Sequence, residues 1–214
     1  MSFDYLPGTN IYLKQRQDMF RINTDTHLLG KFMEINKKDR VLDIGCNNGA
    51  LLLYASQYAQ QLVGIDILNE AIELAKENLA MNKVEARLYN IKAQDFNDEP
   101  FDKIICNPPY FNTKDNGNKN SNYFLEVARH DRYLPLDELF ACYKRLLKDN
   151  GTVYMVHRPS YLAMILDVAK NYKFKCIRMK MIYDQNKQEA VSVLLAFKIG
   201  KTDLIKVEKD EIIR

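Results

Sequence analysis

Two patterns of hydrophobic and polar residues alternate along this chain from about residue 38 onward. Short apolar runs bounded by polar residues or glycine are typical of buried strands. They predict strands over residues 40–45, 62–66, 86–90, 101–107 and 152–157. The segments between them have apolar residues three and four positions apart, which is the spacing of one buried helix face. This alternation predicts a mostly parallel sheet with helices on both faces.

Three helices can be placed from their ends. Asn69 is the expected N-cap of a helix that buries Ile72, Ala75 and Leu79. Pro135 opens a second helix, in which Leu139, Tyr143 and Leu146 recur before the stop signal Asp149-Asn150-Gly151. A third helix is predicted over residues 160–170.

The last part of the pattern predicts a hairpin. Strand-like runs over 174–183 and 190–199 are separated by the polar turn at 184–187, so the second run reverses direction. A change in the parity of polar residues predicts a bulge near Cys176. The expected fold class is α/β: a Rossmann-like, seven-stranded, mostly parallel sheet with its last strand antiparallel and a short N-terminal extension.

Two segments fall outside the alternation. Residues 1–37 precede the first strand, and they include a capped helix start at Thr24 to Gly30. Residues 112–122 are rich in Asn, Lys and Gly and predict a loop that can order over a substrate. We expect an N-terminal extension over 1–37 that covers a cofactor site, a catalytic domain over 38–200 and a tail over 201–214.

Composition narrows the class of protein. A hydrophobic content of 47% in 214 residues suits one domain with a complete core. No export signal or membrane span is recognisable, so we expect a cytoplasmic protein, and a monomer, although the sequence leaves the oligomeric state open. The cysteines lack paired spacing and the three histidines lack ligand spacing, so we expect no disulfide and no metal. These residues are Cys46, Cys106, Cys142, Cys176, His27, His130 and His157.

Charge is distributed unevenly along the chain. Residues 143–214 contain 15 Lys and Arg against 8 Asp and Glu, a balance of +7, whereas the whole chain has +3. A basic C-terminal part suits a polyanion such as RNA, although lysines on exposed surfaces are the commoner explanation.

The turn Asn107-Pro108-Pro109-Tyr110 follows a predicted strand directly. Two consecutive prolines remove two backbone donors and fix φ, so the turn is rigid and its carbonyl groups are free to accept hydrogen bonds. The Asn107 side-chain oxygen and the Pro108 carbonyl can both accept from one NH₂ group, while Tyr110 offers a ring face for stacking. The alternative is an ordinary tight turn at the end of a strand.

A glycine-bearing turn follows the first predicted strand, at Gly45 to Gly49. Glycine lets a ligand approach the backbone, and the following helix start supplies free N–H groups. Asp66 ends the next strand, where a ribose diol is bound in nucleotide-binding folds. Asp95 is placed to accept from an adenine amino group, although an acidic residue in a polar loop is unremarkable by itself. Asp43, at the entrance of the turn, suits a ligand with an ammonium or sulfonium charge.

These motifs resemble the class I S-adenosylmethionine-dependent methyltransferases that act on amino nitrogens, over about residues 38–200. The resemblance implies S-adenosylmethionine as cofactor and a catalytic turn made of Asn107, Pro108, Pro109 and Tyr110. It also implies a set of cofactor-binding residues: Asp43, Gly45, Asn47, Gly49, Asp66, Ile67, Asp95, Asn107, Asp25 and Thr26. Asn47 stands where the family usually has glycine, and asparagine tolerates left-handed backbone better than other side chains.

Four segments resemble the tRNA adenine N6-methyltransferases that modify a valine tRNA next to its anticodon. They are residues 20–30, 107–111, 128–131 and 157–159. The resemblance implies that residues 1–37 fold over the cofactor, although a simple helix cap at Asn23 to Thr26 is the alternative. The candidate substrate-binding residues are Tyr110, Phe111, Arg129, His130, Arg158, Lys173, Lys175, Arg178 and Lys180, with Lys14 added.

Other functions remain open at the level of the sequence. A protein glutamine N5-methyltransferase acting on release factors uses the same proline turn, but it is expected to have a longer helical domain before the first strand. A non-catalytic RNA-binding protein would explain Asn47 and the basic C-terminal part, but not the proline turn. A nicotinamide oxidoreductase shares the sheet and also leaves that turn unexplained.

Overall fold

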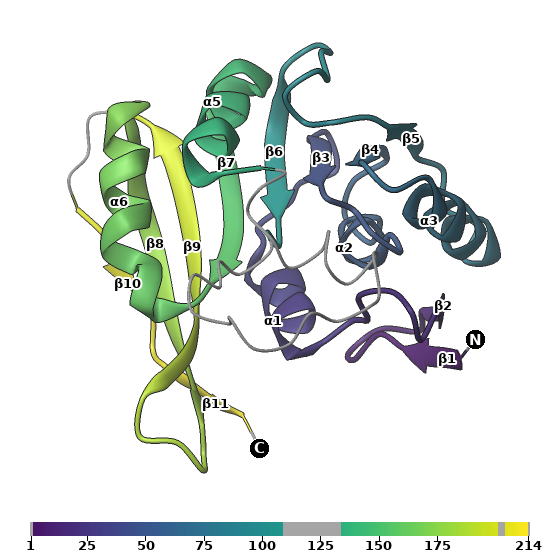
Figure 1. The fold of residues 1–214 in the computed structure, drawn as a ribbon, viewed down its shortest axis with the longest axis horizontal. Coiled ribbons are helices and arrows are strands. Elements are labelled where there is room, and N and C mark those ends of the chain that lie inside the picture. Colours follow the sequence, from purple (N-terminus) through teal and green to yellow (C-terminus); the bar gives the residue numbers. More distant parts are fainter. Residues whose placement is uncertain (1, 109–133, 201–203, 214) are drawn as a thin grey trace.

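The computed structural model describes residues 2–108, 134–200 and 204–213 (Figure 1). Its main sheet has the strand order β10-β8-β9-β7-β6-β3-β4-β5, and β11 also pairs with β8. The seven principal strands are β3 (Arg40–Ile44), β4 (Gln61–Asp66), β5 (Arg87–Asn90), β6 (Phe101–Cys106), β7 (Leu147–His157), β8 (Phe174–Asp184) and β9 (Ala190–Ile199). Among them only β9 is reversed, because it pairs antiparallel with both β7 and β8. The predicted fold class is therefore confirmed.

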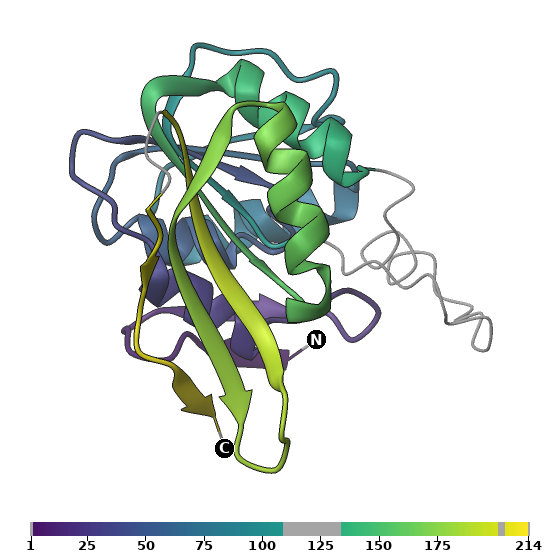
Figure 2. The same ribbon diagram turned by 90° about the vertical axis from the view of Figure 1, so that its left-hand side faces the viewer.

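Helices cover both faces of this sheet (Figure 2). The helices are α1 (Thr24–Phe32), α2 (Ala50–Ala55), α3 (Asn69–Met81), α5 (Leu136–Leu146) and α6 (Leu162–Asn171), with a 3-10 turn, η2 (Pro159–Tyr161). Successive strand residues point to opposite faces, so Leu42 packs with the α5 and α6 side while Val41 packs with α1 and α2. Burial on both faces explains why the central parallel strands β3 and β4 are nearly continuous apolar runs.

Several element boundaries differ from the prediction. Asn69 is the first residue of α3 rather than its N-cap, because the cap position is Leu68, whose N–H donates to Asp66 Oδ1 at 3.0 Å. Strand β7 begins at Leu147 rather than near Thr152, since Leu147 pairs with Phe101 before the register shifts. The predicted bulge near Cys176 is confirmed by a register shift between Cys176 and Arg178.

Part of the predicted C-terminal tail joins the sheet. Strands β10 (Lys206–Val207) and β11 (Glu211–Ile213) pair parallel with β8, whose outer edge would otherwise be open. Both strands are short and largely exposed, so they have no hydrophobic alternation that a sequence pattern could reveal.

The N-terminal extension contains the predicted helix start and an unpredicted hairpin. Asn23 caps α1, and its side chain accepts from the Thr26 N–H at 3.0 Å. Before it, β1 (Ser2–Tyr5) pairs antiparallel with β2 (Tyr12–Gln15). The buried Asn78 of α3 accepts from Lys14 N at 2.7 Å and donates to Lys14 O at 3.1 Å. A side-chain amide thus holds the outer edge of β2 against α3.

Candidate cofactor and substrate site

The candidate residues converge at the carboxyl ends of three adjacent parallel strands. Strand β3 lies between β4 and β6, so Asp43 on β3 is flanked by Asp66 at the end of β4 and by Asn107 directly after β6. Ligands of α/β proteins bind at this edge of the sheet. Asn107 is half-buried and Pro108 is buried.

The glycine turn after β3 has three residues with positive φ and, among the described residues, open space beside its first glycine. Gly45, Asn47 and Gly49 have φ values of 74°, 45° and 79°, which is the left-handed region. A Cβ added to Gly45 would meet no atom of the described residues within 4 Å, so there is room for a ligand against the backbone. The prediction that Asn47 enters the left-handed region is confirmed.

Asp43 carries a buried carboxyl group whose burial is not offset by hydrogen bonds from the described residues. Its side chain is 1% exposed, and within the described part of the chain neither oxygen has a hydrogen-bond partner. Burial raises the pKa of Asp43 to about 8, and repulsion from the Asp66 carboxylate adds to the shift. A buried polar group is normally paired, so this carboxyl group fits a site that receives a cationic ligand.

The carboxylate of Asp66 is oriented by the backbone. Oδ1 accepts from Leu68 N at 3.0 Å and Oδ2 accepts from Asn47 N at 2.9 Å. Burial raises the pKa of Asp66, and these two bonds oppose the shift. A carboxylate oxygen has more than one lone pair, so both oxygens can still accept from the two hydroxyl groups of a ribose.

Two other candidate cofactor contacts flank Asp66. Ile67 is partly buried and packs with a small apolar cluster that includes Met19 of the N-terminal extension. Asp95 is exposed in the turn that follows β5, where its N–H donates to Lys92 O at 3.1 Å. Their contact with a cofactor stays a prediction.

Asp25 and Thr26 lie in the first turn of α1 and are both buried. Asp25 Oδ1 accepts from Ser192 Oγ of β9 at 2.5 Å, while Thr26 Oγ1 donates to Asn23 Oδ1 at 3.1 Å. These bonds fix α1 to the sheet and to its own cap. They hold α1 in place, whereas contact of either residue with a cofactor stays a prediction.

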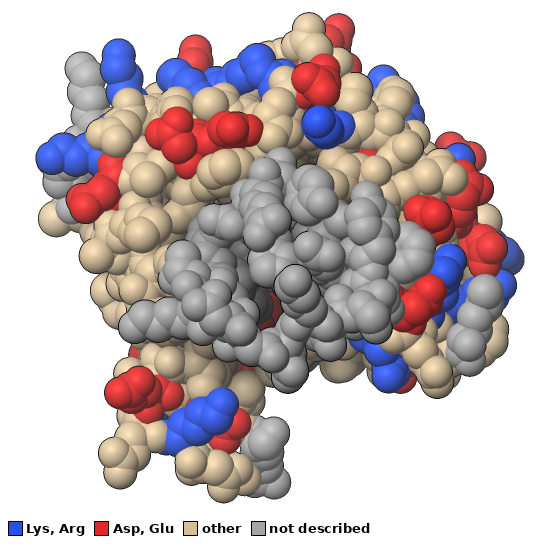
Figure 3. Space-filling model, in the orientation of Figure 1, with Lys and Arg blue, Asp and Glu red and all other residues tan. Residues whose placement is uncertain are grey.

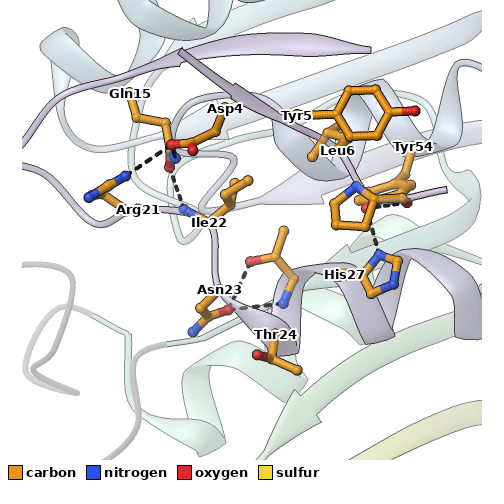
Figure 4. A pocket seen from close by; sticks show the side chains of 12 residues that line it. Asp4, Tyr5, Leu6, Gln15, Arg21, Ile22, Asn23, Thr24, His27 and Tyr54 are labelled. Carbon is orange, nitrogen blue, oxygen red and sulfur yellow. Dashed lines mark hydrogen bonds and ion pairs between the residues drawn. The ribbon is translucent and has the colours of Figure 1, made fainter. Parts of the chain in front are cut away.

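A pocket of about 330 Å³, which no sequence pattern predicted, opens between the hairpin, α1 and α2 (Figure 4). Tyr54 OH donates to Pro7 O at 3.2 Å, so His27 Nδ1 donates the 2.8 Å bond to the same hydroxyl oxygen. Arg21 at the other end pairs with Asp4 at 2.9 Å. Burial lowers the pKa of His27, so the imidazole is neutral near pH 7.

The candidate RNA contacts are not gathered in one place. Arg158 follows β7 and lies at the same edge of the sheet as Asn107, and its Nη1 donates to Val191 O at 2.9 Å. Lys173 and Lys175 lie at the start of β8, which runs parallel to β6, so they are at the opposite edge. Lys180 is farther along β8 and pairs with Glu211 at 2.8 Å. Figure 3 shows Lys and Arg at the upper edge of the molecule, interspersed with Asp and Glu.

Arg178 does not have the role that was predicted for it. Its side chain is buried, pairs with Glu34 and Glu208, and donates to the carbonyl group of Phe32. The guanidinium carbon lies 4.0 Å from the centroid of the Phe32 ring. Arg178 therefore joins the end of α1 to β8 and is not available to an RNA phosphate. Lys14 is similarly engaged, with Glu77 at 3.0 Å, although on the surface.

Some predicted residues cannot be placed. Those that lie outside the described residues are Pro109, Tyr110, Phe111, Arg129, His130 and the loop 112–122. Among the described residues, no group of three His, Cys, Asp or Glu side chains is arranged to hold a metal ion. No helix in the described ranges has the length and apolarity needed to cross a membrane.

The sheet order, the glycine turn, the buried carboxyl group of Asp43 and the Asp66 carboxylate at the end of β4 are those of a class I S-adenosylmethionine-dependent methyltransferase. The sequence model of the methyltransferase small domain family matches residues 11–174. The chain belongs to this family and, within it, to the family of tRNA1(Val) (adenine(37)-N6)-methyltransferases.

Two relatives illustrate the match. The tRNA1(Val) (adenine(37)-N6)-methyltransferase of Shewanella frigidimarina is 30% identical over 184 residues, which cover 80% of this chain and 71% of that protein. The enzyme of the same name from Aliivibrio salmonicida is 29% identical over 183 residues, covering 83% of this chain and 77% of that protein.

Solved structures share the fold. The ribosomal protein L11 methylase of Lactobacillus delbrueckii subsp. bulgaricus has a TM-score of 0.64 and 19% identity, covering 86% of this chain and 83% of that one. The Pyrococcus abyssi tRNA (uracil-54, C5)-methyltransferase, solved with S-adenosyl-L-homocysteine, has a TM-score of 0.63 and 17% identity. It covers 92% of this chain and 44% of that one. At this identity the likeness concerns the fold alone.

Proposed function

We propose that this protein transfers a methyl group from S-adenosylmethionine to the N6 amino group of an adenine in tRNA. The proposed target is adenine 37, next to the anticodon of a valine tRNA, as in the names of the curated relatives. The observation that carries the proposal is the position of Asn107. It follows the strand adjacent to β3, so an amino group held by Asn107 would face the ligand on the glycine turn.

Each group at the site has a distinct proposed role. Asp43 faces the cationic part of the ligand, Gly45 and Gly49 allow it to approach the backbone, and Asp66 accepts from the ribose hydroxyl groups. When bound, S-adenosylmethionine supplies an electrophilic methyl group. The residues of this chain contribute mainly by orienting the nitrogen that attacks it.

The Asn107 side-chain oxygen and the Pro108 carbonyl are proposed to accept from the two N6 hydrogens. These bonds draw the nitrogen out of conjugation with the ring and direct its lone pair at the methyl carbon. The nitrogen that accepts the methyl group would become cationic and would then lose a proton to water. An adenine in a loop leaves its stack at low cost, which favours an anticodon loop as the substrate. Stacking on Tyr110 stays a prediction from the sequence.

The wider arrangement is part of the proposal. Residues 38–200 form the catalytic domain, residues 1–37 cover the cofactor site, and residues 201–214 follow the domain. Firm attachment of α1 through Asp25 and Ser192 supports the covering role of the extension. A tRNA substrate supports a cytoplasmic location, and we propose a monomer.

The test is transfer of radiolabelled methyl from S-adenosylmethionine to unmodified total tRNA, with total protein in parallel. Mass spectrometry of the labelled nucleoside is expected to show N6-methyladenosine in tRNA. Labelled glutamine in protein would instead identify a glutamine methyltransferase. Absence of label in either polymer, with cofactor binding intact, would contradict the proposed substrate.

Replacing Asp66 with alanine is expected to weaken cofactor binding by roughly 10- to 100-fold, because hydrogen bonds to a charged acceptor are lost. Isothermal titration calorimetry with S-adenosylhomocysteine measures this change. Asp102→Ala is the matched control, since Asp102 also accepts from a backbone N–H, at 2.9 Å, but lies at the amino end of β6. Equal affinity of Asp66→Ala and the unaltered protein for S-adenosylhomocysteine would contradict the proposal that Asp66 binds the ribose.

Binding to tRNA is expected to fall steeply with salt, because phosphate contacts release counterions. An anticodon stem extends beyond the catalytic site, so Lys173 and Lys175 at the far edge of the sheet remain proposed phosphate contacts. Changing both to glutamine is expected to reduce the slope of log affinity against log salt by roughly two. Lys76→Gln on α3 is the control, and an unchanged slope in the double variant would make the two lysines ordinary surface residues.

A further inference from the structure

The segment that connects β2 to α1, residues 16–23, is fastened to the cofactor turn by one side chain. Asn47 Nδ2 donates to Phe20 O at 2.7 Å. Only the amide nitrogen can donate to a carbonyl oxygen, so the orientation of the amide group is determined. The backbone of the same residue donates to Asp66 Oδ2 at 2.9 Å. Asn47 therefore links the connecting segment to the carboxylate that is proposed to bind ribose.

A second contact holds the connecting segment against residues that follow Asp66 in the chain. Met19 is 3% exposed and packs with Leu68, Ala71 and Leu74 in the cluster that Ile67 also joins. Two consecutive residues, Met19 and Phe20, thus contact the two segments that frame the cofactor site. The connecting segment is positioned by the turn after β3 and by the start of α3 together.

The backbone of Asn47 is in a conformation that favours glycine. A side chain at a φ of 45° costs conformational energy that glycine avoids, and Gly45 and Gly49 have left-handed φ values in the same turn. What the side chain adds is the hydrogen bond to Phe20. Its amide group reaches the connecting segment, so the departure from the usual glycine provides a contact that glycine cannot make.

We propose that Asn47 is a positioning residue that couples the order of the connecting segment to cofactor binding. A ligand that binds at the glycine turn stabilises this turn, which holds Phe20 through Asn47. The connecting segment is thereby ordered, and its order favours the ligand-bound state. Such coupling is reciprocal, so loosening the segment weakens the binding of the ligand by the same factor by which the ligand favours the ordered segment. The inference rests on the cofactor site and does not depend on the identity of the methylated polymer.

The test uses Asn47→Gly and Asn47→Asp. Glycine relieves the backbone but removes the amide, whereas aspartate keeps the size and the tolerance of left-handed backbone and cannot donate from its carboxylate. Loss of one hydrogen bond is expected to weaken the binding of S-adenosylhomocysteine by roughly three- to tenfold in Asn47→Gly, and by at least as much in Asn47→Asp. Calorimetry measures the affinity, and hydrogen exchange of residues 16–23 measures the order of the segment.

Both variants are expected to speed exchange over residues 16–23 and to reduce the protection that the ligand gives there. Lys83→Gly is the matched control, because Lys83 has a φ of 56° in the turn after α3. Lys83→Gly is expected to change neither the affinity for S-adenosylhomocysteine nor the exchange over residues 16–23. Unchanged or tighter binding by Asn47→Gly would overturn the proposal, as would faster exchange with unchanged affinity. Failure of the unaltered protein to bind S-adenosylhomocysteine would instead contradict the cofactor site itself.

Discussion

Replacing Asn107 with alanine is expected to lower the rate of methyl transfer to tRNA by on the order of 10²- to 10³-fold, while cofactor affinity is retained. The reason is orientation. Without the side-chain acceptor, the amino group stays conjugated with the ring, and its lone pair is not directed at the methyl carbon. Small errors in the placement of reacting atoms have rate effects of this size.

Single-turnover rates at saturating tRNA and cofactor measure this effect apart from binding. Calorimetry with S-adenosylhomocysteine checks that the cofactor site of Asn107→Ala is intact. Asn97→Ala is the matched control, since Asn97 is exposed in the loop before β6 and is expected to retain full activity. A full rate in Asn107→Ala would remove Asn107 from the mechanism, and a parallel loss of cofactor affinity would make it a cofactor ligand instead.

The middle of the sheet was predictable because its strands are buried on both faces. Every residue of β3 is buried, so the apolar run is the strand itself. The reversed strand β9 was predictable from the polar turn before it. Hairpin β1–β2 was not, because its aromatic side chains face solvent and the outer edge of β2 is bonded by the side-chain amides of Asn78 and Asn82.

The site was predictable to the extent that backbone conformation and motif spacing determine it. The left-handed conformation of Asn47 follows from its place between two glycines, and the position of Asp66 follows from the end of β4. Burial of individual charged groups could not be predicted. Arg178 lies between two half-buried lysines in the sequence of β8 and looks like them, yet its side chain is buried and pairs with Glu34 and Glu208. Only tertiary packing separates such a residue from a surface cation.

Asp43 leads to the second large expected effect, a pH dependence of cofactor binding. The pKa of Asp43 is about 8, so the carboxyl group is mostly protonated at pH 6 and must lose its proton to face a cation. Affinity for S-adenosylmethionine is therefore expected to rise by up to about tenfold per pH unit well below pH 8 and less steeply near it, roughly 50-fold between pH 6 and pH 8. A neutral ligand places no such demand on Asp43.

The stability of the cofactor-free protein is expected to change with pH in the opposite direction from the affinity for S-adenosylmethionine. A buried carboxyl group whose pKa is raised from 3.8 to about 8 binds more protons in the folded state, so the cofactor-free protein is expected to lose stability as pH rises through this range. Thermal unfolding at pH 6 and pH 8 measures this loss. Asp43→Asn is expected to abolish it, because the amide does not titrate.

The decisive comparison is between two ligands. 5′-Methylthioadenosine keeps the adenine, the ribose and a thioether sulfur but has neither the sulfonium nor the ammonium charge of S-adenosylmethionine. Calorimetry is expected to show a pH-independent affinity for it, beside the steep rise for S-adenosylmethionine, and a flat profile for both ligands with Asp43→Asn. Equal slopes for the two ligands, or a slope that persists in Asp43→Asn, would show that another group titrates and that Asp43 does not face the cation.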